Sequence, residues 1–286
     1  MSANRWNRHA ALGVGLGLRA AHVEAILAAP APVVPFFELL AENFLGEGGR
    51  PRDTLARVGA VYPLVPHGVS LYVGSADGVD RAHLRRLRAL ADRVDAPWVT
   101  EHLCWGAAGG RTSHELLPLP FTPAVVRLCA EAIREVQDTL GRPFAIENVS
   151  SYLAWRDSTM TEADFVAEVA EAADCGILLD VNNVYVSAVD HGFDPRAYLA
   201  RIPAERVAQL HLAGHVAEEG YLLDTHDQPV AEPVWALYAE ALARLGPTPT
   251  IVEWDGDVPP LAVALAEVER ARAIAAAVSP EVAGAR

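Results

Sequence analysis

The stretch Gln209-Leu210-His211-Leu212-Ala213-Gly214-His215 joins an apolar strand pattern to two histidines at its exit, and Asp224-Thr225-His226 begins 13 residues after His211. A buried parallel strand presents ligand-type side chains in this way at its carboxyl end. Only beyond the last ladder hydrogen bond can polar side chains converge without a large desolvation cost. The stretch therefore predicts a parallel α/β fold with a site where its strands end.

The rest of the chain repeats a strand-then-helix alternation eight times, with no linker between any two units. Closed α/β barrels need about 250 residues, which suits a chain of 286. We therefore predict an α/β fold with a single (β/α)8 TIM-barrel domain over residues 1–286 and a core at about 11–278. A doubly wound sheet is the alternative, because counting units does not prove closure. Strands are expected at 11–18, 36–43, 64–70, 98–105, 144–149, 177–181, 207–212 and 250–254, helices at 20–29, 53–62, 79–94, 122–140, 162–173, 195–200, 234–245 and 261–277, and a long loop at 106–120.

Several helix boundaries are marked by capping residues. Thr122, Thr161 and Asp194 each stand where a helix pattern begins, and their side-chain oxygens can accept from free backbone N–H groups. Gly246 stands where another helix pattern ends, as glycine commonly does. These residues support the predicted positions of four helices.

Composition narrows the function and the compartment. The net charge of −14 argues against nucleic-acid binding, which depends on Lys and Arg displacing counterions from phosphates. Cys104, Cys129 and Cys175 show no CxxC spacing and are expected to be buried thiols in a reducing compartment. The chain shows no secretory signal pattern and no apolar run of about 18 residues. We expect a cytoplasmic protein that does not bind a membrane.

Ionisable and amide side chains stand at the end of nearly every predicted strand. Such groups are costly to bury unless they are paired or coordinate a metal. Imidazoles and carboxylates together bind several divalent ions, and without thiolates the ion is iron, manganese or catalytic zinc. Spacing alone does not choose among these ions, and an acid/base cleft without metal is the other interpretation. The residues are Glu42 and Asn43, His67, Glu101 and His102, Glu147 and Asn148, Asp180 with Asn182 and Asn183, His211 with His215, Asp224 with His226, and Glu253.

Three further motifs carry less weight. Gly13-Val14-Gly15-Leu16-Gly17 is like part of a dinucleotide loop, but it lies inside the first strand, where glycine lets neighbouring backbones approach closely. Ser150 and Ser151 lack the sequence of a nucleophile elbow. His114 and His191 lie in loops, where either could face a substrate or solvent.

The order of the strand-end residues resembles the xylose-isomerase-like barrels that include the endonuclease IV group, whose three-zinc site uses His, Glu and Asp. This chain departs from that pattern at Asn183, where those endonucleases carry a histidine. An amide binds metal more weakly, which puts the same hydrolytic chemistry in doubt. The matching residues are His67, His102, Glu147, Asp180, His211, Asp224, His226 and Glu253.

A closer resemblance covers nearly the whole chain. Several motifs in order look like the multinuclear non-haem iron-dependent oxidative enzymes, the group that includes the iron-binding subunit of methanobactin biosynthesis. The motifs are Glu42-Asn43-Phe44, Pro66-His67-Gly68-Val69-Ser70, Glu101-His102-Leu103-Cys104-Trp105, Leu116-Leu117-Pro118-Leu119-Pro120, Ile146-Glu147-Asn148, Leu179-Asp180-Val181-Asn182-Asn183-Val184-Tyr185-Val186 and His211-Leu212-Ala213-Gly214-His215.

This resemblance implies two or three iron ions in mixed Fe(II)/Fe(III) states, with O₂ as co-substrate. It implies oxidation of a residue, commonly cysteine, in a ribosomally made precursor peptide whose leader is often brought by a small partner protein. His215, Glu101 and Asn148 are the expected catalytic residues, and Glu42, Asn43 and His114 the expected substrate-binding residues. The implied metal ligands are His67, His102, Glu147, Asp180, Asn183, His211, Asp224, His226 and Glu253.

Two other functions stay open on the sequence. The first is a zinc- or manganese-dependent hydrolase or isomerase acting on nucleic acid or sugar, which the acidic charge and Asn183 disfavour. The second is a non-catalytic peptide-binding barrel, which the intact ligand set disfavours. Metal content and turnover of the respective substrates distinguish the three functions.

Overall fold

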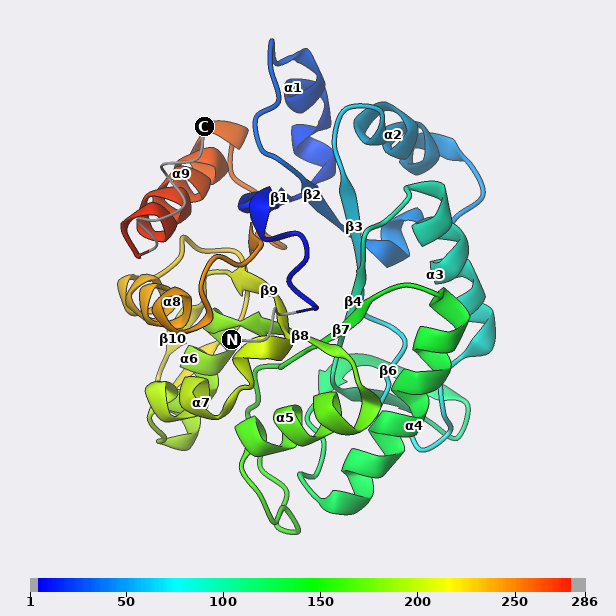
Figure 1. The fold of residues 1–286 in the computed structure, drawn as a ribbon, viewed down its shortest axis with the longest axis vertical. Coiled ribbons are helices and arrows are strands. Elements are labelled where there is room, and N and C mark those ends of the chain that lie inside the picture. The colour runs from blue at the N-terminus through cyan, green and yellow to red at the C-terminus, as the bar shows by residue number, and fades with distance from the viewer. Residues whose placement is uncertain (1–4, 279–286) are drawn as a thin grey trace.

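Eight parallel strands close into a barrel in the computed structural model, which describes residues 5–278 (Figure 1). Around the ring the order is β1-β12-β9-β8-β7-β4-β3-β2, and the first strand pairs with the last. This closure confirms the predicted (β/α)8 barrel and rules out a doubly wound sheet, which keeps two free edges. The strands are β1 (Val14–Gly17), β2 (Phe37–Leu40), β3 (Leu64–Gly68), β4 (Val99–His102), β7 (Phe144–Glu147), β8 (Gly176–Asp180), β9 (Val207–Leu212) and β12 (Thr250–Val252).

Helices surround the barrel, and their caps lie where the sequence predicts them. Thr122 accepts from the N–H of Val125, and Thr161 accepts from the N–H of Asp164. None of the helices in the described chain combines the length and apolar character of a membrane span. The α-helices are α1 (Val23–Ala28), α2 (Gly49–Gly59), α3 (Arg81–Arg93), α4 (Pro123–Leu140), α5 (Glu162–Ala173), α6 (Val181–His191), α7 (Pro195–Arg201), α8 (Glu232–Leu245) and α9 (Leu261–Val278), and short 3-10 turns are η1 (Ala10–Leu12), η2 (Ala20–His22), η3 (Ala41–Phe44) and η4 (Ala204–Arg206).

Two layers of side chains fill the inside of the barrel. Successive residues of a strand point to opposite faces, so residues two apart share a face. Buried apolar side chains lie two positions before strand-end polar groups, in the pairs Val65 and His67, Ala145 and Glu147, Leu178 and Asp180, and Ile251 and Glu253. The first members are apolar side chains beneath the second members, which stand at the carboxyl end. Glu38, level with Val65, and Gln209 are buried polar side chains in the same part of the barrel.

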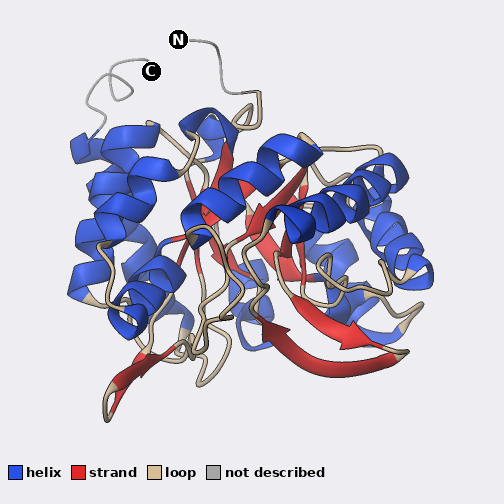
Figure 2. Ribbon diagram, turned by 90° about the horizontal axis from the view of Figure 1, so that it is seen from below, coloured by secondary structure: helices blue, strands red, loops and turns tan. Residues whose placement is uncertain are grey.

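The predicted loop at 106–120 is wrong, because most of it forms a hairpin of β5 (Trp105–Ala108) and β6 (Arg111–Leu117). A second hairpin, β10 (Val216–Glu218) with β11 (Tyr221–Leu223), follows β9. Figure 2 shows both strand pairs at the same end of the barrel. Neither hairpin packs a continuous apolar face on the core, so the sequence carried no alternating pattern that would reveal it.

Helix α6 is also absent from the predicted elements, although it follows β8 directly. Its sequence contains β-branched Val184 and Val186, which disfavour a helix assignment. The helix forms because Asp180 accepts from the N–H of Asn183 at its start and Gly192 adopts a left-handed conformation at its end. Capping therefore outweighs the weak propensity of the sequence.

The three cysteines confirm the sequence prediction of buried thiols. Cys104, Cys129 and Cys175 are free, and each side chain is buried. Burial raises the pKa of the Cys129 and Cys175 thiols to about 12. These thiols are therefore protonated and poor nucleophiles at neutral pH.

Gly15 on β1 lies close to the backbone and ring of Phe36, just before β2. A Cβ atom at Gly15 would lie 2.6 Å from the carbonyl oxygen of Phe36 and 2.8 Å from its ring. We expect Gly15→Ala to lower the free energy of unfolding by about 1–3 kcal/mol, the usual range for overpacking. Gly46→Ala is the control, because a Cβ there meets no atom within 4 Å. Equal stability of the two variants in denaturant unfolding would contradict this account.

Candidate metal centre

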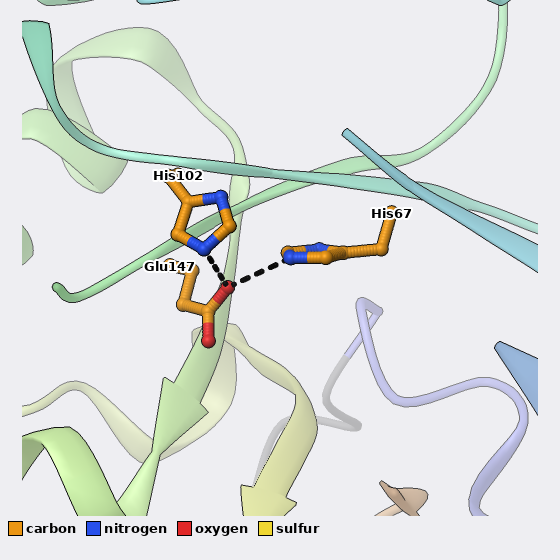
Figure 3. Close-up of side chains that lie close together, drawn as sticks. All are labelled: His67, His102 and Glu147. Carbon is orange, nitrogen blue, oxygen red and sulfur yellow. Dashed lines mark ion pairs between the residues drawn. The ribbon is translucent and has the colours of Figure 1, made fainter. Parts of the chain in front are cut away.

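Glu147 lies between two histidines from neighbouring strands at the carboxyl end of the barrel. The Nε2 atoms of His67 on β3 and His102 on β4 are each 3.3 Å from the Glu147 Oε2 atom. Figure 3 shows both rings pointing at this one oxygen. All three side chains are buried, and their ligand atoms lie within 4.8 Å of one another. This spacing suits one metal ion bound by two imidazoles and a carboxylate.

A second group forms around His211 on β9. Its Nδ1 atom is 3.1 Å from Glu147 Oε1, 3.2 Å from Glu253 Oε2 and 3.9 Å from Asp180 Oδ2. The two oxygens of Glu147 therefore face different histidines. A carboxylate in this position can bridge two cations and reduce their mutual repulsion.

A third group lies beyond Glu253, next to the loop after β11. The Nδ1 atom of His226 is 3.5 Å from Glu253 Oε2, and its Nε2 atom is 2.8 Å from Asp224 Oδ1. Asp180, His226 and Glu253 also have ligand atoms within 4.8 Å of one another. These groups share the carboxylates of Glu147, Asp180 and Glu253, and a fourth group, Glu38 with His211 and Glu253, meets the same distance limit.

Unpaired buried atoms show that these residues fit metal ions. Asp180 Oδ2 and Asn183 Oδ1 are buried and have no hydrogen-bond partner among the described residues, whereas Glu147 Oε2 and His226 Nε2 have only the ion-pair contacts given above. Each such atom costs about 1–3 kcal/mol when left unsatisfied, and more when the group is charged. Cations at this place would bind both of the unpaired oxygens. A cleft that used only acid and base groups would leave Asp180 Oδ2 and Asn183 Oδ1 unpaired.

Outer partners of two histidines leave their inner nitrogens free for a metal. His102 Nδ1 is 3.1 Å from the carbonyl oxygen of Gly68, which only accepts, so this nitrogen carries the proton. His67 Nδ1 is 2.8 Å from the Thr100 hydroxyl oxygen. The inner Nε2 atoms can then act as neutral ligands, as metal-binding imidazoles do.

Mutual charge shifts the pKa values of the cluster. Burial raises the pKa of Glu147, but the charges of His102, His211 and His67 have a larger opposite effect and lower it to about 2. Burial lowers the pKa of His102, but Glu147 and Glu101 raise it more, to about 9. Burial and the charge of Glu147 raise the pKa of Asp180 to about 7. At neutral pH a protonated His102 therefore balances part of the charge of the buried carboxylates.

A cavity of about 570 Å³ opens above these groups and gives them access to solvent. Asn43 and His114, both expected to bind substrate, line this cavity. His114 lies within β6 and has a positive φ of 62°, which is uncommon for residues other than glycine. The other predicted residues in the lining are His67, His102, Asn183, Asp224, His226 and Glu253.

Comparisons with known proteins agree with this arrangement. Residues 13–276 match the family described as RiPP precursor modification enzyme MbnB/TglH/ChrH, where a RiPP is a ribosomally synthesised and post-translationally modified peptide. The chain belongs to this family. A UPF0276 protein of Rhizorhabdus wittichii is 53% identical over 262 residues, which cover 91% of this chain and 94% of that protein. A UPF0276 protein of Caulobacter vibrioides is 50% identical over 261 residues, covering 91% and 93%.

Solved structures similar to this member of the MbnB/TglH/ChrH family are xylose-isomerase-like barrels. A xylose isomerase domain protein of Planctomyces limnophilus matches with a TM-score of 0.57 at 14% identity, covering 96% of this chain and 99% of that one. Endonuclease IV of Thermus thermophilus matches with a TM-score of 0.58 at 16% identity, covering 91% and 97%. These similarities confirm the predicted fold, and at such low identity they do not identify a substrate.

Seven of the catalytic, substrate-binding and ligand residues predicted from the sequence do not line the cavity of this family member. Glu147, Asp180 and His211 are buried in the ligand groups described above, and the other four have different contacts. Glu42 accepts from the N–H of Val69 and contacts His83, and Glu101 accepts from the N–H groups of Leu71 and His102. Both carboxylates thus hold loop backbone in place.

The other two lie beside the predicted ligands. Asn148 exchanges two hydrogen bonds with the backbone of Asp180, at 2.9 and 3.0 Å. His215 is half-buried, and its Nδ1 atom donates to Asn182 Oδ1 at 2.7 Å. Asn182 in turn donates to Asp224 Oδ1 at 2.7 Å. In these positions Asn148 orients Asp180, and His215 orients Asp224.

Sequence reasoning missed two polar residues near the metal centre of this family member. Glu38 on β2 is buried, and its Oε1 atom is 2.8 Å from His211 Nε2. Arg19 Nη2 lies 3.4 Å from Glu253 Oε1. Glu38 could have been found as a carboxylate inside an otherwise apolar strand, two positions before the expected layer of strand-end ligands.

Metal uptake by this family member is expected to release protons at pH 7. His102, with a pKa of about 9, is protonated in the metal-free protein, and a metal ion binds only the neutral ring. Affinity for Zn(II) should therefore rise as the pH increases towards 9. Calorimetric titration in buffers of different ionisation enthalpy measures the protons released. His102→Ala should release fewer, and an affinity independent of pH would contradict the assignment.

Proposed function

We propose that the protein binds two or three iron ions and uses O₂ to oxidise a residue, commonly cysteine, in a ribosomally made precursor peptide. The family supplies the peptide substrate class. The observation that carries the proposal is the overlap of ligand groups around Glu147, His211 and Glu253, beneath an open cavity. A separate small protein that binds the peptide leader is part of the proposal.

The donor set supports iron in this role. The groups contain imidazole and carboxylate donors, with the amide of Asn183 beside them, and no thiolate among the described residues reaches them. Such donors suit iron, manganese and zinc, and the many carboxylates favour higher oxidation states. When bound, iron supplies the exchange of electrons with O₂ that protein side chains lack. The residues that would hold the ions are His67, His102, Glu147, Asp180, Asn183, His211, Asp224, His226 and Glu253.

The chain itself binds the peptide and keeps its own cysteine thiols away from the site. A cavity of about 570 Å³ admits a side chain with its neighbouring backbone. Asn43, His114 and Tyr152 line its opening and can contact the peptide. Cys104, Cys129 and Cys175 are buried away from it, so a reacting thiol has to come from the substrate. These features fit a peptide cysteine.

Turnover of a candidate peptide tests the proposal. Protein loaded with Fe(II) under anaerobic conditions is mixed with a Cys-containing peptide encoded beside its gene, with and without a neighbouring small protein. We expect a mass change that needs both iron and O₂. The same peptide with serine in place of cysteine should stay unchanged. Zn(II)-loaded protein that gives the same product without O₂ would refute the proposed chemistry.

Variants link this activity to the site. Glu147→Gln should lower the bound iron and abolish turnover, because it removes the charge that faces three histidines. Cys129→Ala is the matched control, since Cys129 is buried in α4 outside the cavity, and it should keep both properties. Iron content is measured by elemental analysis and folding by circular dichroism. Full turnover in Glu147→Gln would remove this centre from the reaction.

His215 and His211 are predicted to differ in what they support. His211 contacts three carboxylates of the centre, whereas His215 reaches Asp224 only through Asn182. His211→Ala should lose iron and activity together. His215→Ala should keep most of its iron and turn over about 10- to 100-fold more slowly, as loss of an orienting hydrogen bond does. Equal iron loss in both variants would contradict this division.

A further inference from the structure

A chain of buried polar side chains crosses the inside of the barrel beneath the ligands. Trp98, just before β4, donates from Nε1 to Gln209 Oε1 on β9 at 2.8 Å. Gln209 Nε2 donates to Glu38 Oε2 on β2 at 2.5 Å. Glu38 Oε1 lies 2.8 Å from His211 Nε2. These four residues are at most 4% exposed, so water does not compete for these bonds.

Trp98 determines the orientation of the Gln209 amide group. An indole N–H can only donate, so the atom of Gln209 that faces it has to be the carbonyl oxygen. The amide nitrogen of Gln209 then donates to Glu38. It also lies 2.9 Å from His211 Nε2, but this contact is not a hydrogen bond when Nε2 carries a proton, because both nitrogens are then donors. With one Glu38 oxygen already accepting from Gln209, the other is left to accept from His211.

The consequence for His211 is a proton held on Nε2. A carboxylate oxygen 2.8 Å from an imidazole nitrogen requires a proton between them, so Nε2 carries one. Nδ1 faces Glu147, Glu253 and Asp180 and is also protonated without a metal, so a bound metal ion would replace the Nδ1 proton and leave the one on Nε2. His102 has the opposite arrangement, with Nδ1 bonded outside and Nε2 facing inside.

Two other roles for Glu38 explain less. Glu38 has ligand atoms within 4.8 Å of those of His211 and Glu253, but as a metal ligand it would give up its contacts with Gln209 and His211. As a packing residue it would be costly, because barrel interiors are normally filled by branched apolar side chains. Val65 and Ile251 fill such positions in this barrel.

We propose that Glu38 is a positioning residue for His211, held in its working orientation by Gln209 and Trp98. Glu38 keeps the proton of His211 on Nε2 and so directs Nδ1 to the metal. A carboxylate behind an imidazole also makes the ring a stronger ligand. This inference rests on the proposed metal centre and not on the identity of the peptide.

Metal affinity of three variants tests the proposal without any peptide. Glu38→Gln keeps the shape but removes the charge, Glu38→Leu removes the acceptor, and Trp98→Phe removes the donor that orients Gln209. We expect both Glu38 variants to bind Zn(II) about 10- to 100-fold more weakly in chelator competition. Trp98→Phe should weaken binding in the same direction and less strongly, since it acts through two intervening residues.

The control is Glu162→Gln, a carboxylate-to-amide change at the start of α5, where Glu162 accepts from Tyr198. It should leave Zn(II) affinity unchanged. Thermal unfolding of the metal-free proteins shows whether each variant is folded. If the Glu38 variants fail to fold, Trp98→Phe alone carries the test.

Nitrogen NMR of histidine-labelled, Zn(II)-loaded protein measures what a purely structural role would leave unchanged. The wild type should show one histidine with a proton on Nε2 and zinc on Nδ1, and the Nε2 resonance should shift in Glu38→Gln and in Trp98→Phe. Folded variants with wild-type affinity and an unchanged His211 resonance would overturn the proposal. Failure of the wild type itself to bind metal would instead overturn the proposed function.

Discussion

The sharing of Glu147 by three histidines is the interaction on which the centre depends. His67, His102 and His211 come from three strands, and all three face one buried carboxylate. Without a cation, burial of this many ionisable groups is tolerated only because the imidazole rings pair with carboxylates. The same mixture of histidines and carboxylates can release protons when metal ions bind. The protonation of the cluster and its affinity for metal are therefore linked.

The barrel positions these groups through its register and not through long side chains. His102 is level with Glu147 in the β4–β7 pairing, and Asp180 is level with His211 in the β8–β9 pairing. Asn148 and Asp180 then exchange backbone and side-chain hydrogen bonds just beyond the strands. A shift of one residue in either strand would turn the ligand towards the helices, so the site and the fold are specified together.

The sequence predicted the parts of the molecule that have a local cause. The barrel followed from the strand-helix alternation, the caps at Thr122 and Thr161 from their side chains, and the strand-end residues from their order. The hairpins at β5–β6 and β10–β11 were missed because exposed short strands carry little hydrophobic pattern. Glu38 was missed because its meaning depends on Gln209 and Trp98, which meet it only when the barrel closes. Tertiary contacts of this kind leave no trace in local spacing.

One layer of buried apolar side chains limits how molecules enter and leave the site. It is formed by Val65, Ala145, Leu178 and Ile251. It closes the barrel below the ligands, so the cavity at the carboxyl end is the route by which peptide, product and solvent exchange. A peptide seated over this opening becomes part of the enclosure and shields the groups beneath it from water. Substrate entry and the drying of the centre are then a single event.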